Sequence, residues 1–351
     1  MGDTPLDSVF RGAPPASLVS CENRHMDEVF YDVDGDGITI THPEKVMFPD
    51  RGWTKLDLVD HFLTCVDGAL AGVFGRPTML KCFPRGVAEK PFYRKRAPKS
   101  AGERYFVEFP SGRTAGYFVP RTPHDVIWMA QLNCVDLNPW PTRVEHAEHP
   151  DEFRIDLDPT PEATWSDVQQ VALTVRETLT DFGLIGFPKT SGSKGMHIYV
   201  RIEPRYSFLE VRKAALAFGR EVGRRRPDIV TTQWRKEDRH GIFIDYNQNS
   251  RDRTIAGAYS VRPTGWVSAP LTWAEVPDAE LSDFPMVGFA ARYKAIGDVM
   301  EAIDSKAFRL ESLLDHADRD QAGDLTGEPW PKSFGKPRGR RSWWPLPGES
   351  H

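Results

Sequence analysis

Strict alternation of apolar and polar residues predicts two β-strands in the middle of the chain, at residues 153–158 and 197–202. Side chains two positions apart lie on the same face of a strand, so the apolar residues of each segment face one way and the polar residues the other. Asp156 and Asp158 therefore share one polar face. Asp245 follows a short apolar run, so a third carboxylate can join the pair from a neighbouring strand.

Segments with helical spacing connect these strands. Capping patterns at 164–167 and 207–210 each precede an apolar stripe of helical period; Gly183 ends the first helix and Pro227 bounds the second. Residues 184–187 are expected to form a short strand that is closed by the proline after it. The order strand, helix, strand, strand, helix, strand predicts an α+β fold built on the split ferredoxin-like βαββαβ unit.

The three aspartates predict a metal site. Adjacent carboxylates repel, and one of them would normally take up a proton. A divalent cation removes that conflict, and three carboxylates that hold two metals about 3.5–4 Å apart are used for in-line phosphoryl or nucleotidyl transfer. Hard oxygen ligands suit Mg²⁺ or Mn²⁺ rather than zinc. The alternative for Asp156 and Asp158 alone is a strand edge with exposed acids.

A glycine-rich turn at residues 190–195 predicts a phosphate site beside the acids. It offers two glycines, three hydroxyls and Lys194 in one tight connection, and His197 follows on the polar face of the next strand. Backbone N–H groups of such a turn form an anion-binding concavity, to which a lysine adds a point charge. The turn joins two strands, so it is not a Walker motif. The alternative is a purely structural hairpin turn.

These motifs, in this order, resemble the archaeo-eukaryotic primase superfamily, and within it the polymerase domain of bacterial ligase D, in its stand-alone Prim-PolC form. The resemblance covers roughly residues 38 to 315. It implies a primase-polymerase fold with a ferredoxin/RRM-like catalytic unit and an N-terminal α/β part. Four motifs carry it: DLD at 156–158, SGSKGMH at 191–197, IFIDYNQN at 242–249 and AYSVR at 258–262. Four upstream segments also match, at residues 41–49, 52–55, 81–87 and 92–93.

The resemblance implies a role for each matching residue. It places two divalent cations, Mn²⁺ or Mg²⁺, on Asp156, Asp158 and Asp245, which are the catalytic residues. It assigns nucleotide contacts to Ser191, Lys194, His197, Gln248, Arg262 and Asn138, and DNA contacts to His42, Lys45, Lys55, Phe92 and Tyr93. Among the latter, Lys45 and Lys55 would grip a 5′-phosphate on the downstream strand, and the aromatic pair would stack on the template.

Two positions depart from the family's pattern. The family usually has a histidine where this chain has Asn138, which puts activity or sugar choice in doubt. Asparagine commonly precedes the first phosphate-binding lysine, where this chain has His42. An imidazole can still donate a hydrogen bond to phosphate, so the 5′-phosphate site is expected to be kept.

Without the resemblance, the upstream residues indicate DNA binding less specifically. Lys45 and Lys55 flank a turn before a helix that Thr54 opens, and lone lysines near turns are most often only solvated. Phe92 and Tyr93 precede three basic residues, and aromatic side chains interleaved with basic ones grip single strands at about 1–3 kcal/mol per stacked base. Because neighbours on a strand face opposite ways, at most one of these rings is expected in the core.

Composition sets the outer limits. The chain has 351 residues and a formal net charge of −5, so no global basic field attracts DNA and binding depends on local patches. The four cysteines are widely spaced without a CxxC pair, which indicates no zinc ribbon or disulfide framework and fits a reducing cytosol. No signal peptide opens the chain and no apolar run approaches a membrane span. A cytoplasmic protein of the bacterial nucleoid is expected.

The domain organisation is expected to be one catalytic unit with two appendages. Residues 1–24 are an N-terminal extension and 318–351 a polar, Pro/Gly-rich tail. The catalytic domain, 25–317, divides into a DNA-binding part at 25–150 and a metal and nucleotide part at 151–317.

The expected function is that of a template-directed DNA/RNA primase-polymerase that fills short gaps in DNA repair, with a ribonucleotide preference implied by the resemblance. Its expected partners are gapped or primer–template DNA with a 5′-phosphate, an NTP or dNTP, and a separate DNA ligase or end-joining factor. Two alternatives stay open. One is a catalytically weak module that binds DNA ends or gaps and recruits a ligase, which Asn138 leaves possible; the other is a metal-dependent nuclease on the same acids.

Overall fold

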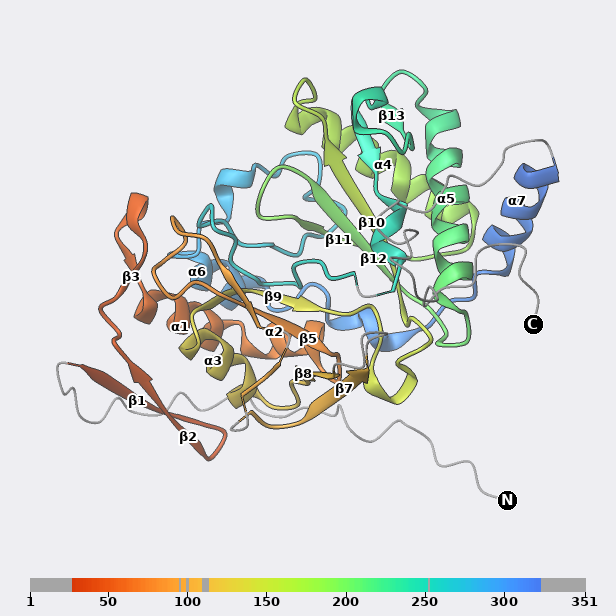
Figure 1. The fold of residues 1–351 in the computed structure, drawn as a ribbon. Coiled ribbons are helices and arrows are strands. Elements are labelled where there is room, and N and C mark those ends of the chain that lie inside the picture. The colour runs from red at the N-terminus through yellow and green to blue at the C-terminus, as the bar shows by residue number, and fades with distance from the viewer. Residues whose placement is uncertain (1–26, 95, 99–100, 109–113, 252, 323–351) are drawn as a thin grey trace.

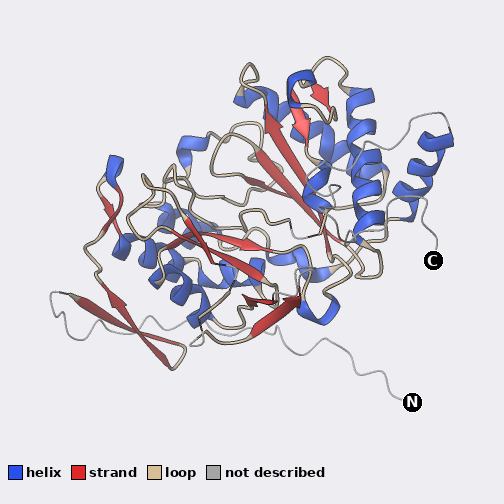
Figure 2. Ribbon diagram, in the orientation of Figure 1, coloured by secondary structure: helices blue, strands red, loops and turns tan. Residues whose placement is uncertain are grey.

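The computed structural model describes residues 27–322 apart from 95, 99–100, 109–113 and 252. Two sheets with their helices lie side by side, one from each half of the chain (Figures 1 and 2). The expectations for residues 1–24 and for 323–351 lie outside the described part. Helix α7 (Glu311–Ala322) runs through position 318, where the sequence places the start of the tail.

The catalytic sheet has the strand order β11-β12-β10-β14-β13. Its first four strands are mutually antiparallel, and the short strand β13 is parallel to β14 at the edge. This is the ferredoxin-like arrangement that the order of elements predicts, with one strand added. The bounds are β10 (Glu152–Pro159), β11 (Phe187–Thr190), β12 (Met196–Arg201), β13 (Val230–Thr231) and β14 (Ile242–Ile244).

Two capped helices cover one face of this sheet. Thr164 and Ser207 form capping boxes at the start of α4 (Trp165–Asp181) and α5 (Phe208–Arg225), as the sequence predicts. The apolar side of β10 packs against them, with the ring centroids of Phe153 and Phe218 5.8 Å apart. The opposite, polar side of β10 therefore faces the N-terminal half of the molecule, and the site is built there.

One strand differs from its predicted position. Residues 184–187 are expected as a strand closed by Pro188, but β11 begins at Phe187 and includes that proline. Residues 183 and 184 belong to the end of α4 and not to a strand, because Gly183 has φ +72° and the Leu184 N–H donates to the Leu179 carbonyl. Pro188 is tolerated because β11 is the edge strand of the sheet, so its missing N–H breaks no ladder with another strand, while its carbonyl accepts from the Leu271 N–H.

The N-terminal half forms a sheet of order β6-β5-β8-β7, with β9 also paired to β5, and helices pack beside it. The strands are β5 (Thr78–Cys82), β6 (Phe92–Arg94), β7 (Arg104–Glu108), β8 (Thr114–Phe118) and β9 (Cys134–Pro139). The helices are α1 (Lys55–Thr64), α2 (Val66–Val73) and α3 (Pro123–Gln131), and Thr54 caps α1 as predicted.

Shorter elements complete the fold. A hairpin, β1 (Glu28–Val33) with β2 (Asp36–Thr41), extends from the N-terminal half, and β3 (Val46–Phe48) pairs with β4 (Trp53–Thr54) (Figure 1). Helix α6 (Phe289–Ile296) and one-turn 3₁₀ segments follow β14. Among the described residues, no helix is both long and apolar enough to cross a membrane.

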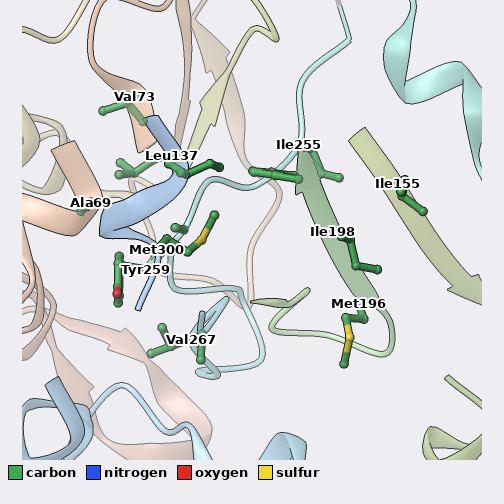
Figure 3. Packing of buried hydrophobic residues seen from close by; sticks show 14 of the residues in the cluster. Ala69, Val73, Leu137, Ile155, Met196, Ile198, Ile255, Tyr259, Val267 and Met300 are labelled. Carbon is green, nitrogen blue, oxygen red and sulfur yellow. The ribbon is translucent and has the colours of Figure 1, made fainter. Parts of the chain in front are cut away.

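One hydrophobic core joins the two halves. Leu137 of β9, Ala69 and Val73 of α2, and Ile155 and Ile198 of the catalytic sheet belong to the same buried cluster (Figure 3). Tyr259 and Met300, from the segment after β14, fill the space between them (Figure 3). The two sheets are therefore held in a fixed relation, which lets side chains from both contribute to one site.

Candidate active site

Three aspartates meet where β10 ends. Asp156 and Asp158 lie on the polar face of β10, and Asp245 follows β14, the neighbouring strand. The Asp245 N–H donates to the Asp156 carbonyl at 2.9 Å, which fixes the two chain segments against each other. Each aspartate offers a carboxylate oxygen within 4.8 Å of the others, as the sequence pattern predicts.

The electrostatics of this cluster suit a cation. Burial raises the pKa of Asp156 well above its usual range, and the charges of Asp158 and Asp245 raise it further. Desolvation and Asp245 likewise raise the pKa of Asp158, and burial raises that of Asp245. Three hard oxygen donors that repel one another fit divalent cations such as Mg²⁺ or Mn²⁺, because the cation offsets the charge that makes the cluster costly.

The turn between β11 and β12 lies next to the acids and is held by hydrogen bonds of its own. The Ser191 hydroxyl accepts from the N–H of Ser193 at 3.1 Å and of Gly195 at 3.0 Å, which folds the loop back on itself. Gly192 has φ +66°, and a Cβ at Gly195 would collide with the Leu157 carbonyl, so both glycines are required by the geometry. The turn thus lies directly over the strand that carries the aspartates.

Lys194, at the tip of this turn, is exposed, and no hydrogen bond or ion pair joins its ammonium to any described residue. Among the described residues it is therefore free to meet a ligand. Arg262 approaches the same turn from another segment, with its Nη1 donating to the Ser191 carbonyl at 3.4 Å. Two cations therefore border the anion-binding turn.

His197 lies between the turn and the acids, fully buried on β12. Its Nε2 is 3.5 Å from Oδ1 of Asp156, and its Nδ1 is 2.7 Å from Nζ of Lys189. Burial lowers the pKa of His197 well below its usual value, and the charge of Lys189 lowers it further. Sequence reasoning missed Lys189, because the predicted strand ended before it.

A second group that sequence reasoning missed borders Arg262. Asp136, on β9, lies between two cations: its Oδ2 is 2.8 Å from Nζ of Lys81 and 3.9 Å from Nε of Arg262. Asn138, two residues further on the same strand, turns its amide to donate to the Asp136 carbonyl at 3.1 Å. The pairing of β9 with β5 brings Lys81 to Asp136, and the Val261 N–H, which donates to the Val135 carbonyl, holds the segment of Arg262 beside the same strand. No local sequence pattern predicts these contacts.

Two more residues act on the acids, Gln248 through a hydrogen bond and Arg239 through its charge. Gln248 donates from Nε2 to Oδ2 of Asp245 at 3.4 Å. Arg239, which sequence reasoning also missed, lies over the Phe243 ring at 3.4 Å from its centroid. Its charge opposes the rise in pKa of Asp158 and Asp245, so it is close enough to act on the acidic cluster.

A separate cationic site lies beside the start of α1. Lys55 is only 3% exposed and donates to the Thr41 carbonyl at 2.9 Å, while Lys45 donates to the Pro84 carbonyl and to Oδ1 of Asn133. Burial lowers the pKa of Lys55 to about 8, and the nearby charge of Lys45 contributes. Among the described residues neither ammonium has an ion-pair partner, so two like charges converge without a counterion.

His42 lies next to this pair in a strained conformation. Its φ is +54°, uncommon for a side chain other than glycine, and its carbonyl accepts from the Lys45 N–H at 3.1 Å. The side chain is exposed. The three upstream residues named by the sequence are thus brought together by the structure, apart from the acidic cluster.

Phe92 and Tyr93 lie on β6, the edge strand of the N-terminal sheet, and are 54% and 55% exposed. Neither ring enters the core, which agrees with the expectation that at most one of them does. A short edge strand leaves both of its faces open to solvent, so neither ring is covered. Together they form an exposed aromatic surface with Arg94 beside Phe92.

This fold and this site define a class of protein. A ferredoxin-like sheet that carries three convergent aspartates beside a glycine-containing turn with an exposed lysine is a nucleotidyltransferase of the primase-polymerase class. The chain belongs to the LigD primase-polymerase domain family, whose model matches residues 54–300. The resemblance to the polymerase domain of bacterial ligase D, inferred from the motifs, is confirmed.

Relatives agree with this assignment. The multifunctional non-homologous end joining protein LigD of Mycolicibacterium smegmatis is 32% identical over 309 residues, which cover 85% of this chain and 40% of that protein. The bifunctional LigD of Bacillus subtilis is 26% identical over 243 residues, which cover 68% of this chain and 39% of that protein. The chain thus spans about two fifths of the length of the curated relatives it matches.

A solved structure is similar over most of the chain. The polymerase domain from Mycobacterium tuberculosis ligase D, determined in complex with DNA, matches with a TM-score of 0.71 and 31% identity. The match covers 77% of this chain and 99% of that domain. The predicted α+β primase-polymerase fold is therefore confirmed.

Proposed function

We propose that this chain is a gap-filling polymerase that adds nucleotides to a primer next to a downstream 5′-phosphate during end-joining repair. The observation that carries the proposal is the convergence of Asp156, Asp158 and Asp245 beside the turn at 191–195. Acids that hold cations and a turn that holds phosphate are the two parts that nucleotidyl transfer requires.

The three aspartates would hold two divalent cations, and the family resemblance favours Mn²⁺ over Mg²⁺. When bound, these ions lower the pKa of the primer 3′-hydroxyl and offset the charge of the triphosphate and of the departing pyrophosphate. The carboxylates fix the position of both reacting groups, because the strand pairing of β10 with β14 holds Asp245 against Asp156.

The nucleotide's phosphates would lie on the turn. The Lys194 ammonium supplies hydrogen bonds and charge, and His197 and Arg262 reach the same space from β12 and from the segment after β14. Gln248 would contact the nucleotide from the Asp245 side. Asn138 would border the sugar, and a preference for ribonucleotides belongs to this proposal.

The DNA would be held by two surfaces of the N-terminal half. Lys45, Lys55 and His42 would bind the terminal 5′-phosphate of the downstream strand, which carries more charge and accepts more hydrogen bonds than a backbone phosphate. Phe92 and Tyr93 would stack on template bases, at about 1–3 kcal/mol per base. The filled gap is a nick, so a separate ligase or end-joining factor is the proposed partner.

The test is extension of a primer on a template with a short gap, with a 5′-phosphate or a 5′-hydroxyl on the downstream strand. Ribonucleotides are compared with deoxyribonucleotides, and Mn²⁺ with Mg²⁺. We expect extension that requires a divalent cation and is faster with the 5′-phosphate. Replacing Phe92 and Tyr93 together with Ala should weaken binding to gapped DNA by about tenfold or more.

Other outcomes would assign other functions. Tight binding of gapped DNA without extension under any metal would indicate a module that binds ends, a reading that Asn138 favours because its amide is already committed to the Asp136 carbonyl. Degradation of DNA in the absence of nucleotides would indicate a nuclease. In that case the phosphate turn and the unpaired Lys194 would have no evident use.

A further inference from the structure

Three adjacent strands place three polar side chains in one row. In the antiparallel register, Lys189 of β11 lies opposite His197 of β12, and His197 lies opposite Asp156 of β10. All three are buried, with Lys189 at 0% and His197 at 3% exposure. Lys189 is a buried ionisable group that the proposed reaction has not yet used.

The hydrogen bonds around Lys189 determine which groups donate. Its Nζ is 2.8 Å from the Ala256 carbonyl, 2.5 Å from Oγ of Ser268 and 2.7 Å from Nδ1 of His197. A carbonyl can only accept, and the Ser268 hydroxyl gives its own hydrogen to the Thr190 carbonyl at 2.7 Å, so it too accepts from the lysine. Burial lowers the pKa of Lys189 well below its usual value, and the charge of Arg262 lowers it further, whereas the charge of Asp156 raises it. The three acceptors around Nζ favour the ammonium, which has three N–H groups, one for each neighbour, whereas a neutral amine has only two.

The hydrogen bond between Lys189 and Nδ1 of His197 determines the tautomer of the histidine. If the Lys189 ammonium donates to Nδ1, that nitrogen carries no hydrogen, and the neutral ring must hold its proton on Nε2. That Nε2 faces Oδ1 of Asp156 at 3.5 Å, and the ionised carboxylate, which is the form that holds a cation, only accepts. The donor on one side of the ring and the acceptor on the other thus favour the same tautomer.

The ring is also held in its plane. Tyr199, two residues along β12, lies parallel to His197 with an interplanar angle of 2° and a centroid distance of 6.5 Å. Its hydroxyl donates to the Ala256 carbonyl at 3.3 Å, the same oxygen that accepts from Lys189. A ring flip would point a C–H at the lysine and leave a buried donor unsatisfied, which is unfavourable.

We propose that Lys189 is a positioning residue that locks His197 in the Nε2–H tautomer, with that N–H directed at the site where the triphosphate binds. Its use toward a triphosphate rests on the proposed function. With the opposite tautomer, a lone pair on Nε2 would face the phosphate oxygens and repel them. Lys189 itself does not touch the nucleotide; it acts through the imidazole.

The first test needs neither nucleotide nor metal. Histidine ring nitrogens labelled with ¹⁵N report the tautomer directly, and His197→Gln assigns the signal. We expect the Nε2–H form in the intact protein and a mixture or the Nδ1–H form in Lys189→Met, which keeps the side-chain length but removes the donor. An Nδ1–H ring in the intact protein, or an unchanged Nε2–H ring in Lys189→Met, would overturn the proposal.

The second test is a double-mutant cycle on nucleotide affinity, with Tyr199→Phe as a buried control that leaves both hydrogen bonds of His197 in place. Loss of a hydrogen bond to a charged group should weaken binding by about tenfold in Lys189→Met and in His197→Ala alike. In the double variant we expect no further loss, because the lysine acts through the histidine.

Additive losses in the cycle would mean that Lys189 contributes to the fold rather than to His197, and would overturn the proposal. If Lys189→Met does not fold, the ring-nitrogen spectrum of the intact protein still decides it. Failure of the intact protein to bind any nucleotide would refute the proposed function instead, and the tautomer measured without nucleotide would separate that result from this one.

Discussion

The two ends of strand β10 bury charge in opposite ways. At its start, Asp151 and Glu152 lie among guanidinium groups: Asp151 is 2.6 Å from Arg76, and Glu152 is 2.7 Å from Arg154, with Arg201 within 3.3 Å of both acids. Burial alone would raise the pKa of these carboxylates, but Arg76 and the other arginines outweigh it, so the pKa of each lies below its usual range.

At the end of the same strand, the balance is reversed. Asp156 is as deeply buried as Glu152, yet its pKa is raised, because its nearest charged neighbours are two more aspartates. Burial is common to both clusters; what differs is the supply of opposite charge from the protein itself. Asp151 and Glu152, paired with arginines, form a compensated cluster that joins the N-terminal half to the catalytic sheet. The three aspartates form an uncompensated cluster, whose opposite charge must come from a ligand.

The largest expected effect is a loss of activity when the aspartates at the end of β10 are replaced. Asp156→Asn and Asp245→Asn should each lower nucleotide addition by more than about a thousandfold, because one cation ligand is lost and the reacting groups are no longer aligned. Binding of gapped DNA should largely survive. The measurement is the single-turnover rate of primer extension together with DNA affinity. Substantial extension by either variant would contradict the assignment of these residues to a shared metal site.

The second effect concerns stability at the start of β10. Glu152→Gln removes the charge that compensates Arg76 and Arg154 while keeping the side chain's shape. Breaking a buried ion network leaves guanidinium groups without a partner, so we expect a loss of about 3 kcal/mol in the free energy of unfolding. Glu203→Gln is the matched control, because that half-exposed acid pairs only with the exposed Arg205 and Arg309, and it should change stability by less than about 0.5 kcal/mol.

The third effect has the opposite sign. With a folded pKa above its unfolded value, Asp156 contributes stability only when protonated, and that contribution is lost as the pH rises through the folded pKa. Asp156→Asn should therefore stabilise the metal-free protein near neutral pH and do so much less near pH 4. Thermal unfolding at both pH values measures it.

Manganese supplies the control for this third effect. Cations that bind the folded state alone should raise the melting temperature of the intact protein and leave that of Asp156→Asn nearly unchanged. If Asp156→Asn destabilises the metal-free protein as Glu152→Gln does, then the carboxylates at both ends of β10 stabilise the fold. The contrast between a paired and an unpaired cluster would then be wrong.

The sequence predicted those parts of the molecule that local chemistry decides. Capping boxes at Thr164 and Ser207, and the alternation along β10, depend on residues a few positions apart, and all are found. The three aspartates follow from the same alternation. The strand β11 was displaced by three residues, because its position depends on pairing with β12 and with Pro270 rather than on local preference.

That displacement is what hid Lys189. A strand that ends before Pro188 leaves this lysine in a loop, whereas the observed register sets it opposite His197. Asp136 and Arg239 were missed for a related reason: each meets its site only through contacts between segments distant in the sequence. A charged residue whose opposite charge comes from a distant segment cannot be recognised from its own segment. A cluster of like charges on one strand can be recognised, because its members are close in the sequence.

The smallest expected effect tests whether a second uncompensated cluster behaves as the acidic one does. Lys45 and Lys55 form a cationic counterpart: Lys55 is buried, Lys45 is half-buried, and neither has an ion-pair partner among the described residues. A lysine is charged below its pKa, and burial lowers that of Lys55 to about 8. The site should therefore bind an anion well at pH about 7 and lose charge as the pH rises to about 9.

The measurement is the affinity for a gapped duplex with a 5′-phosphate, divided by that for the same duplex with a 5′-hydroxyl. A terminal phosphate has its second pKa near 6, so the DNA keeps its charge across this range and any change comes from the protein. We expect the ratio to fall a few-fold between pH about 7 and about 9. Lys45→Ala combined with Lys55→Ala should abolish both the preference and its pH dependence, while extension from the primer continues. A ratio near one in the intact protein would show that these lysines, although uncompensated, bind no phosphate, and that missing counter-charge alone does not mark a ligand site.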